Sequence, residues 1–272
     1  MRIRVRAPAT TANLGPGFDC AAAALDLWNE LEVRVAASQS PDPEHLAVHA
    51  FARLASTEGL SFTFTDRIPR ERGLGSSAAT VALGLVAGAI AAGREPVPEE
   101  LLALGVDLEG HPDNLAAALT GGVCLTWEGR IVRVADDLPA RAIALIPPER
   151  VGTKAARSAL PEQVPHADAA YTAARATLLG AALAGGSAEL FAAAANDRIH
   201  EPYRAAGAPL LAVVRARLPE GAVAATISGS GPTVIVWARP EAVDTCAVEL
   251  RERLERTKVL PLRVASAGAG AF

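Results

Sequence analysis

Alternating polar and apolar residues mark candidate strands along this chain. Residues 2–7 alternate arginine with apolar side chains, and this period of two is typical of a strand with one buried face. Similar alternation, or a short apolar run bounded by turn residues, predicts further strands over residues 31–36, 61–65, 123–127, 131–134, 141–146, 222–227, 233–238 and 262–266.

Apolar residues at helical spacing account for much of the remaining chain. They predict a short helix over residues 20–25 and other helices over 45–56, 78–92, 99–109, 112–120, 169–184, 187–195, 209–217 and 241–256. Residues 8–19 are rich in proline, glycine and polar side chains, so we expect a loop there. Because strands and helices are mixed without regular alternation, the pattern favours an α+β fold over a doubly wound sheet.

The bulk composition narrows the class of protein. The chain has 272 residues, of which 50% are apolar and 21% are charged, which is enough for a large core in one or two domains. Its net charge of −4 gives no support to nucleic-acid binding. Two successive prolines at 147–148 are the expected boundary between an N-terminal domain, residues 1–147, and a C-terminal domain, residues 148–272.

Cysteine usage and the apolar runs indicate a cytoplasmic protein that does not enter a membrane. Cys20, Cys124 and Cys246 are widely spaced and form neither a CxxC pair nor a Cys/His cluster, so no disulfide framework or zinc site is expected. The first residues follow a strand pattern and do not resemble a signal peptide. The apolar run 78–92 is shorter than the roughly 18–20 residues that span a bilayer.

A loop rich in glycine and serine stands directly ahead of that apolar run and reads GLGSSAA from Gly73 to Ala79. A tight loop that feeds a helix N-terminus presents free N–H groups and a partial positive charge, and such an end binds phosphate. Two alternatives compete: a plain helix start capped by serine, and a variant of the dinucleotide fingerprint. The second is weak because a proline-broken segment, residues 93–98, follows where a strand is required, and no lysine follows the glycines as in a Walker loop.

Two other glycine-rich loops accompany the first. Residues 8–19 read PATTANLGPGFD and residues 228–233 read SGSGPT. Taken singly, the first can be a turn in which Asp19 caps a helix, and the second can be a β-turn between strands. Three polar, glycine-rich loops in one compact chain favour a shared binding site, because sites are commonly built from loops on a rigid scaffold.

Together these segments resemble the GHMP small-molecule kinases, and the resemblance is nearest to the homoserine branch of that family. It rests on the run from Pro69 to Ala79, on the other two loops, and on EGHPDN at 109–114, TKAAR at 153–157 and EPYR at 201–204. The resemblance implies an N-terminal domain like ribosomal protein S5 domain 2 and a ferredoxin-like C-terminal domain. It also implies ATP-dependent phosphorylation of the side-chain hydroxyl of L-homoserine, in threonine biosynthesis. A homodimer is the family expectation.

The resemblance also assigns roles at the substrate end. It places Arg157 and Arg204 on the substrate carboxylate with Thr153 nearby, and guanidinium suits this task because it binds a carboxylate bidentately. Asp19 takes the ammonium, and Asn13 lies near the hydroxyl. Taken singly, each arginine would be read as a solvated surface charge, and only its motif argues for more.

The resemblance assigns the catalytic role to Asn114 and places its side chain near the substrate hydroxyl. An amide cannot accept the hydroxyl proton as a carboxylate can. Phosphoryl transfer tolerates this, because its transition state is loose and alignment with charge neutralisation carries the rate. The neighbouring Asp113 can cap the following helix or touch substrate, and the five histidines show no ligand spacing.

For ATP and magnesium, the resemblance implies a binding segment and two metal ligands. The nucleotide contacts are expected along one continuous run: Pro69, Arg70, Glu71, Arg72, Gly73, Leu74, Gly75, Ser76, Ser77, Ala78 and Ala79. Ser77 and Glu109 are the expected ligands of Mg²⁺, which prefers oxygen donors. The purely structural alternatives are helix capping for the two serines and an exposed position at a helix end for Glu109.

Two rival functions remain at this stage. The first is another GHMP kinase with a different alcohol substrate, against which Arg157 and Arg204 together with Asp19 argue. The second is a non-catalytic sensor of ATP or an amino acid, against which the intact loops, Ser77 and Asn114 argue.

Overall fold

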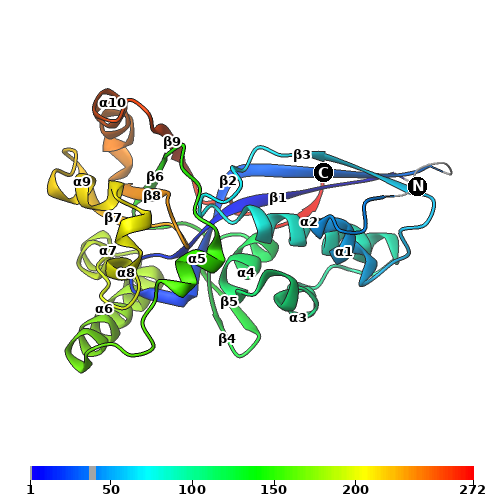
Figure 1. Ribbon diagram of the computed structural model, residues 1–272, viewed down its shortest axis with the longest axis horizontal. Helices are drawn as coiled ribbons and strands as arrows, with labels where there is room; N and C mark the ends of the chain where they lie inside the picture. The colour runs from blue at the N-terminus through cyan, green and yellow to red at the C-terminus, as the bar shows by residue number, and fades with distance from the viewer. Residues whose placement is uncertain (1, 37–40) are drawn as a thin grey trace.

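A computed structural model describes residues 2–36 and 41–272 and contains two antiparallel sheets arranged end to end (Figure 1). The first sheet has the order β10-β1-β2-β4-β5, with β3 also paired to β2. Its strands are β1 (Arg2–Asn13), β2 (Gly17–Val35), β3 (Leu60–Thr65), β4 (Val123–Trp127), β5 (Arg130–Ala135) and β10 (Gly270–Ala271). The second sheet has the order β7-β8-β6-β9, formed by β6 (Arg141–Ile146), β7 (Ala222–Ile227), β8 (Val234–Ala238) and β9 (Lys258–Leu262).

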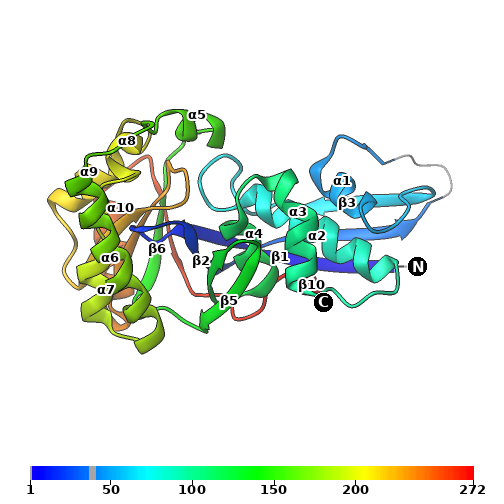
Figure 2. The ribbon, with the colours of Figure 1, turned by 90° about the horizontal axis from the view of Figure 1, so that it is seen from below.

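Four helices pack on one side of the first sheet. They are α1 (Leu46–Ala52), α2 (Ser76–Ala91), α3 (Pro98–Glu109) and α4 (Pro112–Thr120). Figure 2 shows them beside the long strands β1 and β2, and α2 and α4 contact both of these strands. The helix α2 is apolar on all sides because it lies in the middle of this layer, with α1, α3 and α4 around it.

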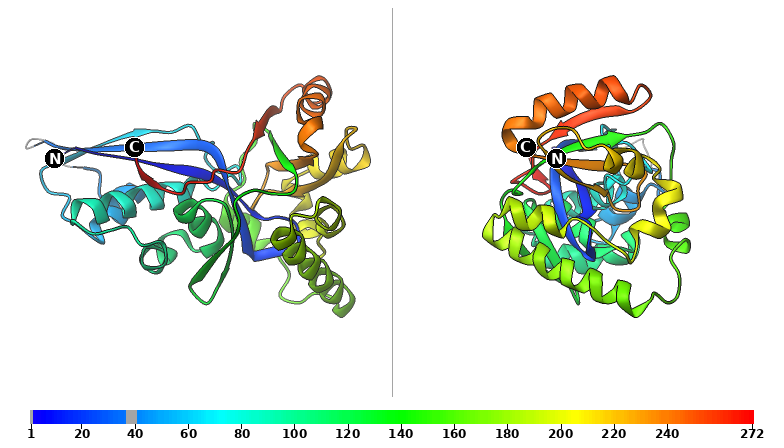
Figure 3. Two further views of the ribbon diagram at one scale, coloured as in Figure 1. Left: turned by 180° about the vertical axis from the view of Figure 1, so that it is seen from behind. Right: turned by 90° about the vertical axis from the view of Figure 1, so that its left-hand side faces the viewer.

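The second sheet is covered on both faces. The helices of this half are α5 (Thr153–Ser158), α6 (His166–Gly185), α7 (Ala188–Ala194), α8 (Glu201–Arg204), α9 (Leu210–Ala216) and α10 (Val243–Arg253), with short 3-10 turns at Ala205–Gly207 and Pro240–Ala242. Successive side chains of a strand point to opposite faces. On β6, Ile143 and Leu145 accordingly pack in the core cluster formed with α9 and α10, whereas Ala142 and Ala144 belong to the main core shared with α6 and α7. Figure 3 shows these two helical layers on either side of the sheet.

The predicted α+β class is confirmed, and most predicted elements are present within one or two residues. The clearest error is the short helix predicted over residues 20–25, which lies inside β2. This alanine-rich stretch has helical propensity, but Ala21 to Ala23 pair with β4, and Ala22 packs in a buried cluster with Ala12 and Ala117. Small side chains there allow α4 to lie directly on the strands, so tertiary packing overrides local propensity.

Other differences concern strand lengths. Residues 8–13 and 17–19, expected to belong to a loop, continue β1 and β2, and only a tight turn separates the two strands. The last strand was expected over 262–266, but β9 ends at Leu262 and only a single bridge joins Val264 to Leu25. The short elements α5, α8 and β10 were not predicted.

The division of the chain at residues 147 and 148 stays a prediction, and sheet pairing argues for moving it. The strand β6 precedes Pro147 but pairs with β8 and β9 in the second sheet. At the other end, β10 returns to pair with β1 in the first sheet. Within the described ranges, no helix combines the length and apolar character needed to cross a membrane.

Two helix glycines allow a matched test of the packing around α2. A Cβ atom on Gly84 of α2 would lie 2.1 Å from the carbonyl oxygen of Ala47 on α1, whereas one on Gly180 of α6 would meet no atom within 4 Å. We expect Gly84→Ala to lower the free energy of unfolding by about 1–3 kcal/mol through overpacking. Gly180→Ala should raise it by about 0.5–1 kcal/mol, the usual gain from replacing a helix glycine. Urea denaturation of both variants measures the two changes in the free energy of unfolding. A stabilising Gly84→Ala would contradict the close approach of α1 and α2.

Candidate active site

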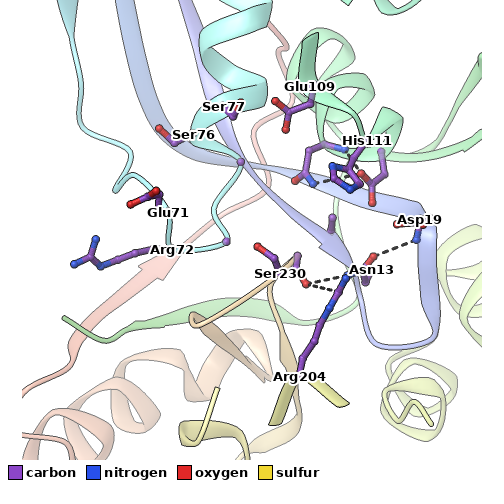
Figure 4. Close-up of a pocket in the computed structure, with 16 residues that line it drawn as sticks. Asn13, Asp19, Glu71, Arg72, Ser76, Ser77, Glu109, His111, Arg204 and Ser230 are labelled. Atoms are coloured by element: carbon purple, nitrogen blue, oxygen red, sulfur yellow. Dashed lines mark hydrogen bonds between the residues drawn. The ribbon is translucent and has the colours of Figure 1, made fainter. Parts of the chain in front are cut away.

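A polar pocket lies where the two sheets meet (Figure 4). It is open to solvent, and its empty volume is about 720 Å³ when the solvent at its mouth is included. Its walls come from the turn after β1, the glycine loop before α2, the junction of α3 and α4, the helix α8 and the turn after β7. The lining residues are Ala12, Asn13, Asp19, Glu71, Arg72, Gly73, Gly75, Ser76, Ser77, Glu109, His111, Asp113, Asn114, Arg204, Gly229 and Ser230.

The three glycine-rich loops converge on this pocket and are bonded to one another. The Oγ of Ser228 lies 2.6 Å from the Gly73 carbonyl oxygen and 2.9 Å from the Thr11 hydroxyl. Because a carbonyl only accepts, Ser228 donates to Gly73 and receives a hydrogen bond from Thr11. The backbone N–H of Thr10 also donates to Leu74, and that of Gly229 donates to Ala12. The convergence expected from the sequence therefore occurs through direct contacts.

Glycine is required at two places in the loop before α2. Gly75 has a φ of +64°, and a Cβ there would lie 1.8 Å from the Thr10 hydroxyl oxygen. A Cβ on Gly73 would lie 2.3 Å from the carbonyl oxygen of Ser228. These close approaches bring the start of α2 to the pocket, and Ser76 and Ser77 line it. A helix of this length ending at a polar pocket can bind an anion through its first N–H groups.

The remaining residues of the predicted nucleotide segment divide into pocket residues and supporting residues. Glu71 and Arg72 line the pocket, and Arg72 fixes the loop by donating to the carbonyl groups of Pro147 and Pro148. The side chains of Leu74, Ala78 and Ala79 are buried in the core and do not line the pocket. Pro69 and Arg70 lie outside the lining as well, and Arg70 pairs with Asp66.

At the start of α4, a short hydrogen-bond chain orients Asn114. The Thr10 hydroxyl donates to Asn114 Oδ1 at 2.6 Å, which leaves the Asn114 amide nitrogen on the side of Asp113 Oδ1, 3.3 Å away. Asp113 is 2% exposed, and burial raises its pKa to about 6 although the Asn114 backbone N–H donates to it. Asp113 does not cap α4, because His111 is in the cap position and no side-chain cap hydrogen bond is present, whereas Asp113 lies inside the helix. It lines the pocket, and its contact with substrate stays a prediction.

A buried carboxylate faces the serine at the start of α2. The Oε2 atom of Glu109 is shielded from solvent and has no hydrogen-bond partner among the described residues. Burial raises the pKa of Glu109 to about 7, the Asp113 carboxylate adds to this, and a hydrogen bond from Ser77 offsets part of it. The alternative of an exposed helix end is therefore wrong for this carboxyl group. An unpartnered carboxylate oxygen beside a hydroxyl is a suitable donor pair for a hard cation.

Among residues 2–36 and 41–272, no group of three or more His, Cys, Asp or Glu side chains could hold a metal by itself. This agrees with Mg²⁺ chemistry, since Mg²⁺ is usually held by one or two carboxylates together with waters and substrate phosphates.

The end of the pocket at Asp19 and Arg204 carries opposite charges, and Arg157 pairs with Asp19 without being a lining residue. Arg157 binds Asp19 bidentately, with distances of 2.7 and 3.2 Å from its two terminal nitrogens to the carboxylate oxygens. Arg204 is 7% exposed and donates to the Gly229 carbonyl, which also accepts from the Asn13 amide. Burial and the charge of Arg157 lower the pKa of Arg204.

The backbone at this end adopts conformations that non-glycine residues rarely take. Asn13 and Asp19 have φ values of 73° and 54°. The Asn13 side chain bridges them, because its Oδ1 accepts from the Asp19 backbone N–H. Such conformations cost energy and persist where the surroundings enforce them, often at functional sites. The side chain of Thr153, at the start of α5, lies outside the described part of the structure.

Sequence reasoning gave no site role to four pocket residues, Ala12, His111, Gly229 and Ser230, or to Phe18. Burial and then the Arg157 charge lower the pKa of His111, so the imidazole is neutral at physiological pH. Its position between Glu109 and Asn114, both assigned to the site, was the available signal. Ser230 belongs to the third glycine-rich loop, whose convergence was expected without a residue being chosen.

Comparisons with known proteins agree with this geometry. The chain matches the family models "GHMP kinases N terminal domain" over residues 44–122 and "GHMP kinases C terminal" over residues 169–256. A homoserine kinase of Streptomyces coelicolor is 40% identical over 267 residues, which covers 89% of this chain and 86% of that protein. A homoserine kinase of Synechococcus is 34% identical over 299 residues, covering 97% and 94%.

Solved structures of kinases have the same fold as this chain. The crystal structure of homoserine kinase from Cytophaga hutchinsonii superimposes with a TM-score of 0.90 at 26% identity, covering 100% of this chain and 97% of that one. The mevalonate kinase of Methanococcus jannaschii has a TM-score of 0.73 at 13% identity, covering 97% and 98%, and shares the fold.

The raised pKa of Glu109 makes stability depend on pH in a direction that can be tested. The pKa of Glu109 is about 7 in the folded protein and about 4.5 in the unfolded chain. Below pH 4.5 the group is protonated in both states, so its burial as a charge does not lower the free energy of unfolding there. Between pH 4.5 and 7 the unfolded chain releases its proton first, and stability falls by up to about 3 kcal/mol. We expect Glu109→Gln to remove this loss and to be more stable than the parent at pH 8 in the absence of divalent cations. Thermal unfolding from pH 4.5 to 8 tests this, and parallel curves for the two proteins would contradict it.

Proposed function

The chain belongs to the GHMP kinase family, and we propose that it is a homoserine kinase, which transfers the γ-phosphoryl group of ATP to the side-chain hydroxyl of L-homoserine in threonine biosynthesis. One observation carries the proposal. The pocket that Ser76 and Ser77 line at the start of α2 is also lined by Asp19 and Arg204. Arg157 is not a lining residue, and it joins the site through its bidentate ion pair with Asp19. An amino-acid alcohol and a nucleotide phosphate need this combination of charges.

The Asp19–Arg157 ion pair explains selection of a zwitterion. Both side chains are about 40% exposed and Asp19 lines the pocket, so a ligand bound beside Asp19 can reach them. The ammonium of homoserine replaces Arg157 as the partner of Asp19, and the carboxylate replaces Asp19 as the partner of Arg157. Arg204 supplies a second guanidinium for that carboxylate, and Asn13 holds the backbone of Asp19 in place. A ligand with only one of the two charges would leave one member of the pair without a partner, which is costly in a partly buried site.

The phosphate side of the pocket fits ATP with Mg²⁺. The first N–H groups of α2 and the hydroxyl of Ser76 face the phosphates, and Glu71 and Arg72 form the neighbouring wall. Ser77 and Glu109 are the residues that would hold Mg²⁺, because Glu109 Oε2 is buried without a partner next to Ser77. The bound ion supplies positive charge that neutralises the transferring phosphoryl group.

The reaction then depends on alignment more than on proton removal. Asn114 is held by Thr10 and Asp113, and its amide can orient the homoserine hydroxyl but cannot take its proton. In a loose transition state the bond from the γ-phosphorus to ADP is largely broken while the bond to the hydroxyl oxygen has hardly formed, so the proton can leave late, to an oxygen of the transferred phosphoryl group. The N–H groups of α2 meanwhile stabilise the charge on the phosphoryl oxygens.

We further propose a cytoplasmic location, which the three free and widely spaced cysteines support, and a homodimeric state, which the family resemblance supports. Sedimentation equilibrium tests the second, and a monomer at micromolar concentrations would contradict it.

Removing Arg157 tests the carboxylate clamp. We expect Arg157→Ala to lower kcat/KM for homoserine by roughly 10²–10³, about 2–4 kcal/mol of transition-state stabilisation, because a charge-assisted bidentate contact is lost. Arg94→Ala is the matched control, since Arg94 is an exposed arginine that pairs with Glu100 on the surface. A coupled assay of ADP release over homoserine and other alcohols measures both. Turnover of another alcohol with none of homoserine would assign the chain to a different substrate within the family.

Removing the Ser77 hydroxyl tests the metal assignment. We expect Ser77→Ala to raise the Mg²⁺ concentration for half-maximal activity several-fold with folding intact, because one of the two protein ligands is lost. Ser61→Ala is a control, since its hydroxyl lies on the exposed β3. Magnesium titrations of the steady-state rate measure the effect, and an unchanged Mg²⁺ dependence would remove Ser77 from the metal site.

A further inference from the structure

An aromatic pair lies beneath the charged end of the pocket. Phe18, near the start of β2, stacks on His200, which directly precedes α8, with ring centroids 4.9 Å apart and an angle of 19° between the rings. Phe18 is half-buried and His200 is fully buried. The two rings thus connect the turn that carries Asp19 with the helix that carries Arg204.

Both arginines of the substrate end lie over the Phe18 ring. The Cζ atom of Arg157 is 5.3 Å from the ring centroid and that of Arg204 is 5.1 Å from it. Both distances are within the range of cation–π attraction. The two guanidinium groups come from different helices, α5 and α8, and Phe18 is the side chain that both contact.

The positive charges of Arg157 and Arg204 repel each other, and the Phe18 ring offers both of them an attractive contact. Burial and the charge of Arg157 disfavour the protonated form of Arg204, and Asp19 pairs directly with Arg157 but not with Arg204. The face of an aromatic ring carries a negative quadrupole, which attracts guanidinium groups and does not compete with a carboxylate for their N–H donors. A carboxylate side chain in this place would instead occupy the donors that the substrate needs.

His200 fixes the ring on which Phe18 stacks. Its Nε2 lies 2.7 Å from the Gly15 carbonyl oxygen, so Nε2 carries the hydrogen. Burial lowers the pKa of His200, so the ring is neutral and its Nδ1 is an acceptor, 3.4 Å from the Nη1 of Arg204. Asp197 holds the backbone here by accepting from the N–H groups of Ile199, His200 and Glu201.

We propose that Phe18, braced by His200, is a positioning residue that holds the guanidinium groups of Arg157 and Arg204 together, so that both act on the substrate carboxylate. The inference rests on the proposed function, because it assigns the two arginines to that carboxylate. It adds a specificity determinant that makes no charged contact with substrate and works through the ring face. It follows that Phe18 controls affinity for the amino acid and leaves affinity for ATP unchanged.

The first test distinguishes the contribution of the aromatic ring of Phe18 from that of its apolar volume. We expect Phe18→Leu to raise KM for homoserine by about 5- to 30-fold, the effect of losing two cation–π contacts, with KM for ATP within about 2-fold of the parent. Phe18→Tyr keeps the ring and should restore KM for homoserine to within about 2-fold of the parent. Phe191→Leu is the matched control: its ring contacts Trp237 and lies among buried apolar residues, so this change should lower thermal stability without altering KM for homoserine.

The second test changes the ring's electrostatics alone. Site-specific replacement of Phe18 by mono-, di- and trifluorinated phenylalanine weakens the ring quadrupole stepwise with little change in volume. We expect the logarithm of KM for homoserine to rise steadily with the number of fluorines, with no parallel trend in KM for ATP or in melting temperature. A flat series, or equal changes in both KM values, would overturn the proposal in favour of a packing role.

The two proposals fail in different ways. If the parent protein does not phosphorylate homoserine, the proposed function is wrong, and the inference about Phe18, which rests on that function, is overturned with it. If the parent is active but the series is flat, the function stands and the role of Phe18 is wrong. Homoserine amide, which lacks the carboxylate charge, provides an internal check, because its weaker turnover should not vary along the series.

Discussion

The buried Ser228 hydroxyl, between the Gly73 carbonyl and the Thr11 hydroxyl, is the contact on which the site depends. These three residues come from chain segments that are far apart in sequence, and each segment belongs to a different wall of the pocket. Their close approach excludes any side chain at Gly73, where even a Cβ would lie 2.3 Å from the Ser228 carbonyl. Because the approach fixes where α2 begins, it also fixes the distance between the phosphate-binding end and the substrate end.

The pocket contains buried ionisable groups whose charged forms are not fully stabilised by neighbouring protein groups. Glu109 and Asp113 are carboxyl groups whose pKa burial raises, and Arg204 is a guanidinium whose pKa burial lowers. Each of these groups would be more stable in water, so the ligand-free protein gives up stability to keep them in place. Their signs are those that a divalent cation at one end and an amino-acid carboxylate at the other would satisfy.

The sequence was sufficient to predict many of the residues that line the pocket, but not how these residues contact one another. The motifs around Asn13, Ser77 and Asn114 named residues that do line one pocket, because glycine and small polar side chains at close spacing are typical of ligand-binding loops. The same motifs misled about the backbone, since residues 8–13 continue a strand that pairing with β2 holds extended. The bidentate contact of Asp19 with Arg157 joins residues 138 positions apart, and no local pattern predicts it. The unpartnered state of Glu109 Oε2 depends likewise on how α3 meets α2, which propensity does not determine.

The return of the last strand to the first sheet has a mechanical consequence. The polypeptide crosses from the first sheet to the second between β5 and β6, and it crosses back between β9 and β10. Two covalent crossings, with the Leu25–Val264 bridge beside the second, restrict how the two halves can rotate relative to each other. Opening of the Asp19–Arg157 contact is a smaller change that needs no such rotation, because it moves only side chains at the pocket.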